Sequence, residues 1–402
     1  MKQSGKVLLW GMAAVLCTGA CSKDDASQSN LEQSGVIEQF GFAIDLNNPA
    51  NYAGQGVPDY ITRDNSRGNA ITDLGATLGR VLFYDRNLSV DNTIACASCH
   101  QQALAFGDLP AGSRGVNGTT GRHSMRLVNA RFGNEARFFW DERAPTLEFQ
   151  STQPIQDHIE MGFSGQEGDP GFGDLIVKLE ALDYYRDLFT AVYGDAEITE
   201  ERMQNALAQF VRSIQSFDTK YDRGRARVAN DRQPFPNFTA QENRGKQLFL
   251  DDAVFNAAGV RVAGGLGCGS CHQAPEFDID PNSGNNGVIT TLADAGVDFS
   301  VTRSPTMRDA VKADGSTNGP FMHTGTFPDM GSVMDHYNTI TAQGNPGLDP
   351  RMRPNGTGQR LAMTPEERQA VIVFMRTLAG NNVYTDPRWS NPFQRGGRDR
   401  QR

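Results

Sequence analysis

The sequence predicts a mainly α-helical, loop-rich protein in which one structural module occurs twice. Three observations support this prediction. Matching segments recur in the two halves of the chain, apolar segments carry helix start signals, and strand-like alternation of apolar and polar residues is scarce. With 43 Gly and 19 Pro among 402 residues, and 38% hydrophobic residues, the composition indicates a globular protein with many loops.

The internal repeat has an opening and a closing segment. Residues 78–85, LGRVLFYD, match residues 244–251, RGKQLFLD, and residues 206–214 match residues 370–378. The offset is 166 residues between Gly79 and Gly245 and 164 residues between Phe210 and Phe374. Because order and spacing are kept, we expect two domains of one type.

The closing segments carry clear signals for the start of a helix. Thr199 precedes Glu200 and Glu201, and Thr364 opens the run Thr-Pro-Glu-Glu, which is a capping box with proline at the first helical position. By contrast, residues 108–122 and 340–358 contain too much Gly, Pro and polar sequence for regular structure. Each module therefore reads as a helix, long loops and a closing helix.

These signals give a division of the chain into five parts. We expect a signal peptide, a tether with an N-terminal extension, two related domains and a polar tail. Their respective ranges are 1–20, 21–60, 61–230, 231–385 and 386–402.

The first twenty residues have the pattern of an export signal. Lys2 and Lys6 precede a short apolar run, and small residues stand just before Cys21. This resembles a bacterial lipoprotein signal, in which that cysteine is lipidated, although ordinary cleavage nearby is the alternative. We therefore expect a periplasmic protein anchored by lipid at Cys21, on the periplasmic side of the outer membrane.

Charge and cysteine count narrow the function classes. The net charge is −9, and without residues 1–20 the chain has 36 basic against 47 acidic residues, or −11. This balance argues against a nucleic-acid partner, which needs clustered cations. Of six cysteines, Cys17 leaves with the signal and Cys21 takes the lipid, while the other four lie in two CxxCH motifs.

The two CxxCH motifs are Cys96–His100 and Cys268–His272. In such a motif both thiols form thioethers to a haem and the adjacent histidine ligates the iron. A thioredoxin-like or zinc CxxC is the alternative. Two copies at equivalent places of an internal repeat favour two covalently bound haem c groups. A buried porphyrin also provides a core for loop-rich helical domains, so we expect two cytochrome c-like haem domains.

Several segments in family order resemble the bacterial di-haem cytochrome c peroxidases and the related MauG group, from about residue 70 to 380. They are Leu78–Asp85, Asn87-Leu88-Ser89, Cys96–His100, Phe138-Phe139-Trp140-Asp141, Glu160-Met161-Gly162 and Phe321-Met322-His323-Thr324-Gly325. The resemblance implies that peroxide reacts at the N-terminal haem and that electrons enter through the second haem.

The resemblance assigns catalytic roles to Glu160, Gln150 and Trp140. Cleavage of the O–O bond requires a proton to move from the inner to the outer oxygen, which a carboxylate such as Glu160 can do. Gln150 would hold peroxide or water by hydrogen bonding, and Trp140 would lie between the haems. Singly, each residue could also be an ordinary surface or core side chain.

Two departures from the classical members bear on the haem ligands. Classical members close the resting peroxide haem with a loop histidine, but residues 101–139 contain only His123, in the family's Gly-Arg-Asn segment. We therefore expect an open, five-coordinate iron at His100. At the second haem, the axial position falls on Tyr337, as in MauG-like members, and Met334 is a rival one helical turn away. A phenolate would stabilise ferric iron.

The remaining candidates receive structural roles. His323 is expected to order the second haem pocket, Met322 and Met330 to pack in the core, and His336 to lie on the polar surface. His158 is expected to be exposed, with assistance in proton transfer as the alternative. The resemblance also implies a calcium ion held partly by the carbonyls of Asn318 and Pro320. His123, however, replaces the family's asparagine, and imidazole is a poor calcium ligand, so calcium is doubtful.

The sequence thus favours a di-haem peroxidase that acts on hydrogen peroxide and receives electrons from a small donor such as a cytochrome c or a cupredoxin. The alternative is a MauG-like oxidase that stores oxidising equivalents across both haems and oxidises a protein or a small molecule. A non-catalytic electron carrier is the third hypothesis, in which Glu160 and Gln150 would have no purpose.

Overall fold

A computed structural model describes Met1 and residues 31–134, 137–166, 168–279, 283–293, 296–395 and 398–399. Residues from Glu32 onward form one compact unit that contains both CxxCH motifs. The expected signal peptide, the expected lipidation site Cys21 and the first part of the tether lie outside the described residues.

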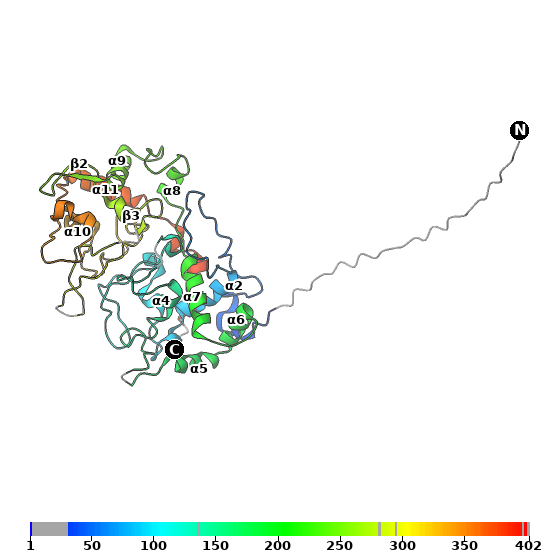
Figure 1. Cartoon of the computed structure of the whole chain (residues 1–402). Coiled ribbons are helices and arrows are strands. Elements are labelled where there is room, and N and C mark those ends of the chain that lie inside the picture. Colours follow the sequence, from blue (N-terminus) through cyan, green and yellow to red (C-terminus); the bar gives the residue numbers. More distant parts are fainter. Residues whose placement is uncertain are drawn as a thin grey trace. The chain divides into compact units, whose positions relative to one another are not determined.

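Helices dominate the regular structure, as predicted (Figure 1). The α-helices are α1 (Ser34–Phe40), α2 (Asp73–Tyr84), α3 (Cys96–Cys99), α4 (Leu147–Thr152), α5 (Phe172–Glu180), α6 (Asp183–Tyr193), α7 (Glu200–Ser213), α8 (Lys220–Arg225), α9 (Ala240–Leu250), α10 (Met330–Asn338) and α11 (Pro365–Arg376). The strands are β1 (Ala253–Phe255), β2 (Arg261–Gly264), β3 (His272–Gln273), β4 (Asp278–Ile279), β5 (Gln394–Arg395) and β6 (Arg398–Asp399). They pair in sequence order as short antiparallel ribbons.

Each repeat contains one close helix crossing, α2 with α7 and α9 with α11 (Figure 1). A β-carbon placed on Gly79 would lie 2.0 Å from the carbonyl oxygen of Ala206, and one on Gly245 would lie 1.9 Å from that of Ala370. Neither distance leaves room for a side chain, so glycine is required at both crossings. In both halves, the opening segment of the repeat therefore packs against the closing segment in the same way.

The start signals of the closing helices are confirmed. Thr199 accepts a hydrogen bond from the backbone N–H of Arg202 and caps α7, and Thr364 forms a capping box with Glu367 at the start of α11. These bonds satisfy N–H groups that a helix terminus leaves without partners, so the predicted boundaries have a local cause.

The repeat also includes a pair of buried polar residues, Asn129 and Asp309, which lie outside the matched sequence segments. The backbone N–H of Asn129 donates to Ile214 O at 2.9 Å, and that of Asp309 donates to Leu378 O at 3.2 Å. Both acceptors directly follow a closing helix or its cap. In each repeat, a turn that follows the motif is therefore tied to the end of the closing helix.

Residues 386–393 differ from the expected polar tail. The Trp389 side chain is 1% exposed, and its carbonyl accepts a hydrogen bond from Tyr84 Oη at 2.6 Å. Phe393 packs edge-to-face on Phe40 at 4.9 Å between ring centroids. The prediction was wrong for this segment because Trp389 and Phe393 anchor it. The prediction considered the mostly polar composition of the tail and not these two aromatic residues.

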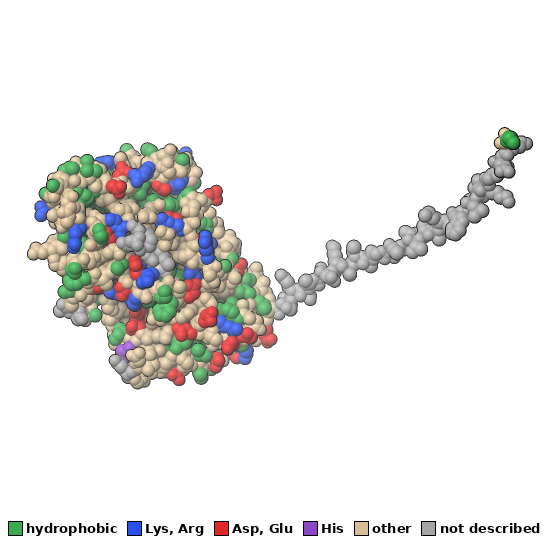
Figure 2. Space-filling model, viewed as in Figure 1, with side chains coloured by type: hydrophobic (Ala, Val, Ile, Leu, Met, Phe, Trp, Pro, Cys, Tyr) green, Lys and Arg blue, Asp and Glu red, His purple; other side chains and the backbone are tan. Residues whose placement is uncertain are grey.

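On the face shown in Figure 2, acidic and basic side chains are interspersed with uncharged ones, in agreement with a modest net charge. Among the described residues, none of the helices combines the length and apolar character needed to cross a membrane.

Candidate functional site

The first CxxCH motif folds as one helical turn, α3, with His100 directly after it. Cys96 and Cys99 form no disulfide, and burial raises the pKa of both thiols to about 12. His100 Nδ1 lies 3.1 Å from Phe106 O. When Nδ1 donates to this carbonyl, Nε2 keeps its lone pair and is available to a metal.

The thiols and His100 open onto a cavity that Gln150 and Glu160 also line. Gln150 comes from α4, which begins after the cap Thr146. The apolar part of the wall comes from α2 and α7, at Phe83, Leu207 and Val211. The structure thus brings together the two polar residues that the sequence assigned to the peroxide site.

Glu160 lies in a turn that Asp157 holds. Asp157 Oδ1 accepts hydrogen bonds from the N–H groups of Ile159 at 2.8 Å and Glu160 at 3.0 Å. Burial, and then the charge of Asp157, raise the pKa of Glu160 to about 7, while Arg143 acts in the opposite direction. A carboxyl group with a pKa near neutrality can both accept and release a proton at physiological pH.

The loop after the first motif is fastened to this turn. The N–H of Val116 donates to Glu160 O at 3.0 Å, and that of Asn117 donates to Ile159 O at 3.2 Å. Gly115 permits the approach, because a β-carbon there would lie 2.0 Å from Ile159 O. The backbone of Glu160 is therefore held from two sides.

His123, the only histidine of residues 101–139, has other partners. It is buried, its Nδ1 lies 2.9 Å from Pro110 O, and its backbone N–H donates to His323 O at 2.7 Å. This placement agrees with an open iron position at His100, which stays a prediction.

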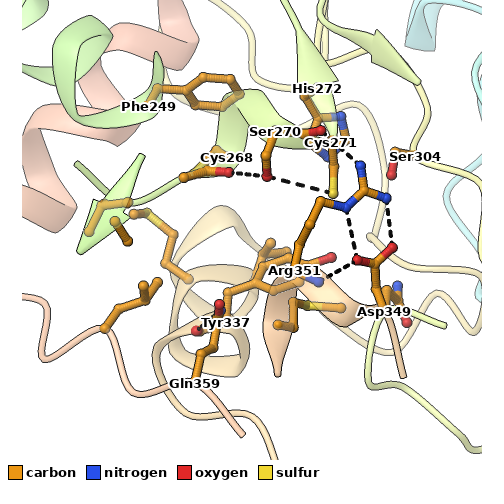
Figure 3. A pocket seen from close by; sticks show the side chains of 18 of the residues that line it. Phe249, Cys268, Ser270, Cys271, His272, Ser304, Tyr337, Asp349, Arg351 and Gln359 are labelled. Atoms are coloured by element: carbon orange, nitrogen blue, oxygen red, sulfur yellow. Dashed lines mark hydrogen bonds and ion pairs between the residues drawn. The ribbon is translucent and has the colours of Figure 1, made fainter. Parts of the chain in front are cut away.

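The second motif opens onto a cavity of about 380 Å³ (Figure 3). Cys268–Ser270 form a short 3₁₀ turn before Cys271 and His272, and β3 begins at His272. On the polar side, Arg351 pairs with Asp349 at 2.7 Å and donates to Ser270 O at 2.9 Å (Figure 3). Much of the remaining wall is apolar, with contributions from Phe249, Leu266, Val333, Val371 and Met375.

Tyr337 and Met334 both line this second cavity, one turn apart on α10. Tyr337 also lines the adjoining cavity that contains Trp140, whereas Met334 does not. His336 was expected on the polar surface. It is instead partly buried, with Nε2 2.9 Å from Asn286 O. That expectation was wrong because a loop distant in sequence covers this side of α10.

Trp140 lies between the two motifs. It lines one cavity together with His100, Gln150 and Glu160, and another together with His272 and Tyr337. Its position is fixed by two hydrogen bonds: Nε1 donates to His123 O at 2.6 Å, and its own carbonyl accepts from Arg303 N at 2.7 Å.

Both cavities have the donor set of a haem c site. Each presents two thiols outside any disulfide, an adjacent, partly buried imidazole and a largely apolar wall, which are the groups that attach and ligate a covalent haem. Burial lowers the pKa of both His100 and His272, so each ring is neutral and able to bind iron near pH 7.

Comparison with known proteins agrees with this donor set. Residues 74–230 match the family model described as di-haem cytochrome c peroxidase. The chain is 28% identical to the methylamine utilization protein MauG of Methylophilus methylotrophus over 78% of this chain and 84% of the relative. It is 30% identical to the cytochrome c peroxidase Ccp of Escherichia coli over 63% of this chain and 50% of the relative.

A solved structure is similar over nearly its whole length. It is a MauG-like protein associated with microbial copper homeostasis, with a TM-score of 0.64, 25% identity, and coverage of 85% of this chain and 99% of that one. The chain belongs to the di-haem cytochrome c peroxidase and MauG family. It is therefore an oxidoreductase of the cytochrome c peroxidase type.

His323 lies on the side of the first haem site and not at the second. We expected it to order the second haem pocket, but it lines the cavity of Glu160 and packs edge-to-face on Trp140 at 6.3 Å between ring centroids. Its Nε2 lies 3.3 Å from Thr290 O. His158, expected as an exposed residue, pairs with Asp169 at 2.8 Å with 39% of its side chain exposed.

Met322 and Met330 are buried, as expected of packing residues. The calcium expectation stays untested. The Asn318 side chain is buried and donates to Asp309 O at 2.7 Å, and Pro320 lines the cavity of Trp140. Within the described ranges, no three His, Cys, Asp or Glu side chains are grouped as metal ligands.

Sequence reasoning missed the arginines around Trp140. Arg122 bridges Asp141 at 2.5 Å and Asp298 at 2.6 Å, and so joins the two halves beside Trp140. Arg126 and Arg303 line both cavities that Trp140 lines. No local pattern marked these arginines, because their place beside Trp140 depends on contacts between segments that are distant in sequence.

Proposed function

We propose that the chain is a di-haem peroxidase that reduces hydrogen peroxide with electrons received through the second haem. One observation carries the proposal: Trp140 lines both the cavity of Glu160 and Gln150 and the cavity of His272 and Tyr337. In this proposal, Trp140 joins a site that would move protons to a site that would hold the electron-transfer haem. The family supports a di-haem enzyme, and its members include both peroxidases and MauG proteins.

In this proposal the two motifs hold the haems, and the bound haems supply the iron that binds peroxide and the path for electrons. Cys96, Cys99 and His100 would attach and ligate the first haem, and Cys268, Cys271 and His272 the second. Tyr337, which lines the second cavity, would supply a further ligand to the second iron.

The remaining residues transfer protons, bind peroxide and hold Trp140 in place. In the overall reaction, peroxide would take up two electrons from the haems and two protons and leave as two waters. As the O–O bond breaks, the Glu160 carboxylate would accept a proton from the inner oxygen and return it to the outer oxygen, which leaves as the first water. The pKa of Glu160 near 7 suits it to both transfers. The Gln150 amide donates a hydrogen bond to peroxide. Trp140, fixed by His123 O, keeps a polarizable ring between the two sites.

A MauG-like oxidase is the second candidate, and Tyr337 favours it. Tyr337 lines both the second cavity and the Trp140 cavity, so a phenolate ligand there would stabilise oxidised iron close to Trp140. The substrate in that case is a protein or a small molecule. A non-catalytic electron carrier is less well supported, because Glu160 and Gln150 line the first cavity.

We further propose that the protein is exported, lipid-anchored at Cys21 and faces the periplasm, with a small cytochrome c or cupredoxin as its electron donor. Replacing Cys21 with Ser should release the protein from membrane fractions. Retention of that variant in the membrane would contradict the anchor.

One experiment separates the candidates. Stoichiometric hydrogen peroxide is added to the oxidised protein, and absorption spectra and oxidation of reduced cytochrome c are followed. Rapid cytochrome oxidation supports the peroxidase. A lasting spectral change with little cytochrome turnover supports the oxidase, and no spectral change leaves the carrier. Glu160→Gln should abolish the fast peroxide reaction, whereas Glu180→Gln, an exposed carboxylate at the end of α5, should not.

A further inference from the structure

Arg126 lies between the two candidate haem sites. It lines the cavity that contains His100 and Glu160, and also the cavity that contains His272 and Tyr337. Its guanidinium lies 5.8 Å from the centre of the Phe321 ring. No role for this residue follows from the peroxide chemistry of Glu160.

The Arg126 guanidinium lacks the partners that a buried cation needs. Its Nε is buried and has no hydrogen-bond partner, and Nη2 reaches Thr306 O only at 3.5 Å. Burial lowers its pKa to about 10, so it is still charged at neutral pH. Asp309 attracts it, but Asp309 Oδ1 accepts from Gly380 N at 2.8 Å and from the Tyr384 hydroxyl at 3.0 Å. A buried charge without a close partner is costly.

Arg303 also has a guanidinium group with N–H donors that lack partners. It is 6% exposed, lines the same two cavities, and has Nε and Nη2 without hydrogen-bond partners. The carboxylate that pairs with it, Asp278, is 3.8 Å from its Nη2. Arg126, which is partly buried, and Arg303, which is buried, therefore both present unused N–H donors to the two cavities that they line. Such donors match the geometry of a carboxylate, which accepts two parallel hydrogen bonds from one guanidinium.

We propose that Arg126, together with Arg303, binds the propionate carboxylates of both haems and thereby takes the place of an interdomain calcium ion. The inference rests on the proposed function, because both haems must be attached. Each haem c carries two propionates, so anionic groups enter the two cavities with the cofactors themselves. Arg126 then sets the electrostatic potential at both irons.

The surroundings of Arg126 also argue against calcium. A β-carbon placed on Gly107 would lie 2.9 Å from Arg126 Cγ and 3.4 Å from Asn318 O, so the side chain runs beside the carbonyl expected to bind calcium. Pro320, the second expected carbonyl donor, lines a cavity with Arg126. A guanidinium at this place repels a divalent cation and supplies positive charge itself.

The test measures the midpoint potentials of both haems in the wild type, Arg126→Gln and Arg126→Lys, after a haem count on each protein. Loss of the positive charge stabilises ferric iron, so Arg126→Gln should lower both potentials, and Arg126→Lys should keep them close to the wild type. Arg143→Gln is the matched control, because Arg143 lines one of the same cavities but is 53% exposed and paired with Asp141.

The outcomes are distinct. Fewer than two haems in the wild type would defeat the proposed function itself. Two haems with potentials that Arg126→Gln leaves unchanged, or changes no more than Arg143→Gln does, would overturn the role of Arg126. A calcium chelator should leave the wild-type potentials and melting temperature unchanged. A chelator-induced shift in either quantity would show that calcium, and not Arg126, supplies the charge.

Discussion

Replacing Glu160 with Gln removes the one proposed proton carrier of the peroxide site and keeps its shape. The turn is held through backbone groups, by Asp157 on one side and by Val116 on the other, so the variant should fold normally. A positioned general acid–base contributes about 10²–10⁴-fold to a rate, and the peroxide step should slow by that amount.

The pH dependence gives the sharper part of this prediction. The active form is the carboxylate and its pKa is about 7, so the wild-type peroxide rate should fall about tenfold per pH unit below neutrality. The Gln variant should show a slow rate without this slope. Stopped-flow mixing with peroxide between pH 5 and 9 measures both, with Glu180→Gln as the control.

The contribution of Glu160 to folding stability should fall as pH rises, whereas the peroxide rate should increase. The pKa of Glu160 is raised from 4.5 to about 7 in the folded protein, which corresponds to about 3 kcal/mol favouring the protonated form. This stabilisation is present below pH 4.5 and is lost as pH rises through 7, so Glu160→Gln should gain in relative stability above pH 7. Denaturant unfolding at pH 5 and 8 tests this. A wild-type rate that is flat across pH 7, with no stability gain in the variant, would refute the reasoning.

The other predictions concern packing, electron transfer and the second iron. Gly79→Ala should lower the unfolding free energy by at least about 1–3 kcal/mol because its β-carbon meets a backbone carbonyl, whereas Gly173→Ala, with open space in α5, should raise it by about 0.5–1 kcal/mol. Denaturant titration of both variants measures these changes, and equal effects would show that glycine is not required at the crossing. Trp140→Phe should keep the peroxide reaction but slow oxidation of cytochrome c, and unchanged turnover would remove Trp140 from the path. Tyr337→Phe should alter the spectrum of the second haem and Met334→Leu should not; the reverse result would identify methionine as the ligand.

The sequence predicted those features that local patterns encode. Thr364 and Thr199 cap their helices because the capping signal needs only a few adjacent residues. Gly79 and Gly245 emerged from the repeat, and the structure adds the reason, which is the close approach of two backbones. Glu160 and Gln150 came from the family resemblance, and folding brings them to one cavity.

The sequence could not predict features that depend on contacts between distant segments. His336 is covered by the loop of Asn286, and Trp389 is anchored by Tyr84, although each looks polar or terminal in its local context. The position of Arg126 between two cavities likewise arises only when both halves are folded. Its neighbours in sequence give no hint of an unpaired cation.

The most direct test of the account adds hydrogen peroxide and reduced cytochrome c to the fully oxidised protein without prior reduction. We predict immediate cytochrome oxidation, because His100 and Glu160 line one cavity and we expect a haem iron bound there to keep an open position for peroxide. Activity only after reduction of the protein, or no activity with two haems attached, would contradict the central claim.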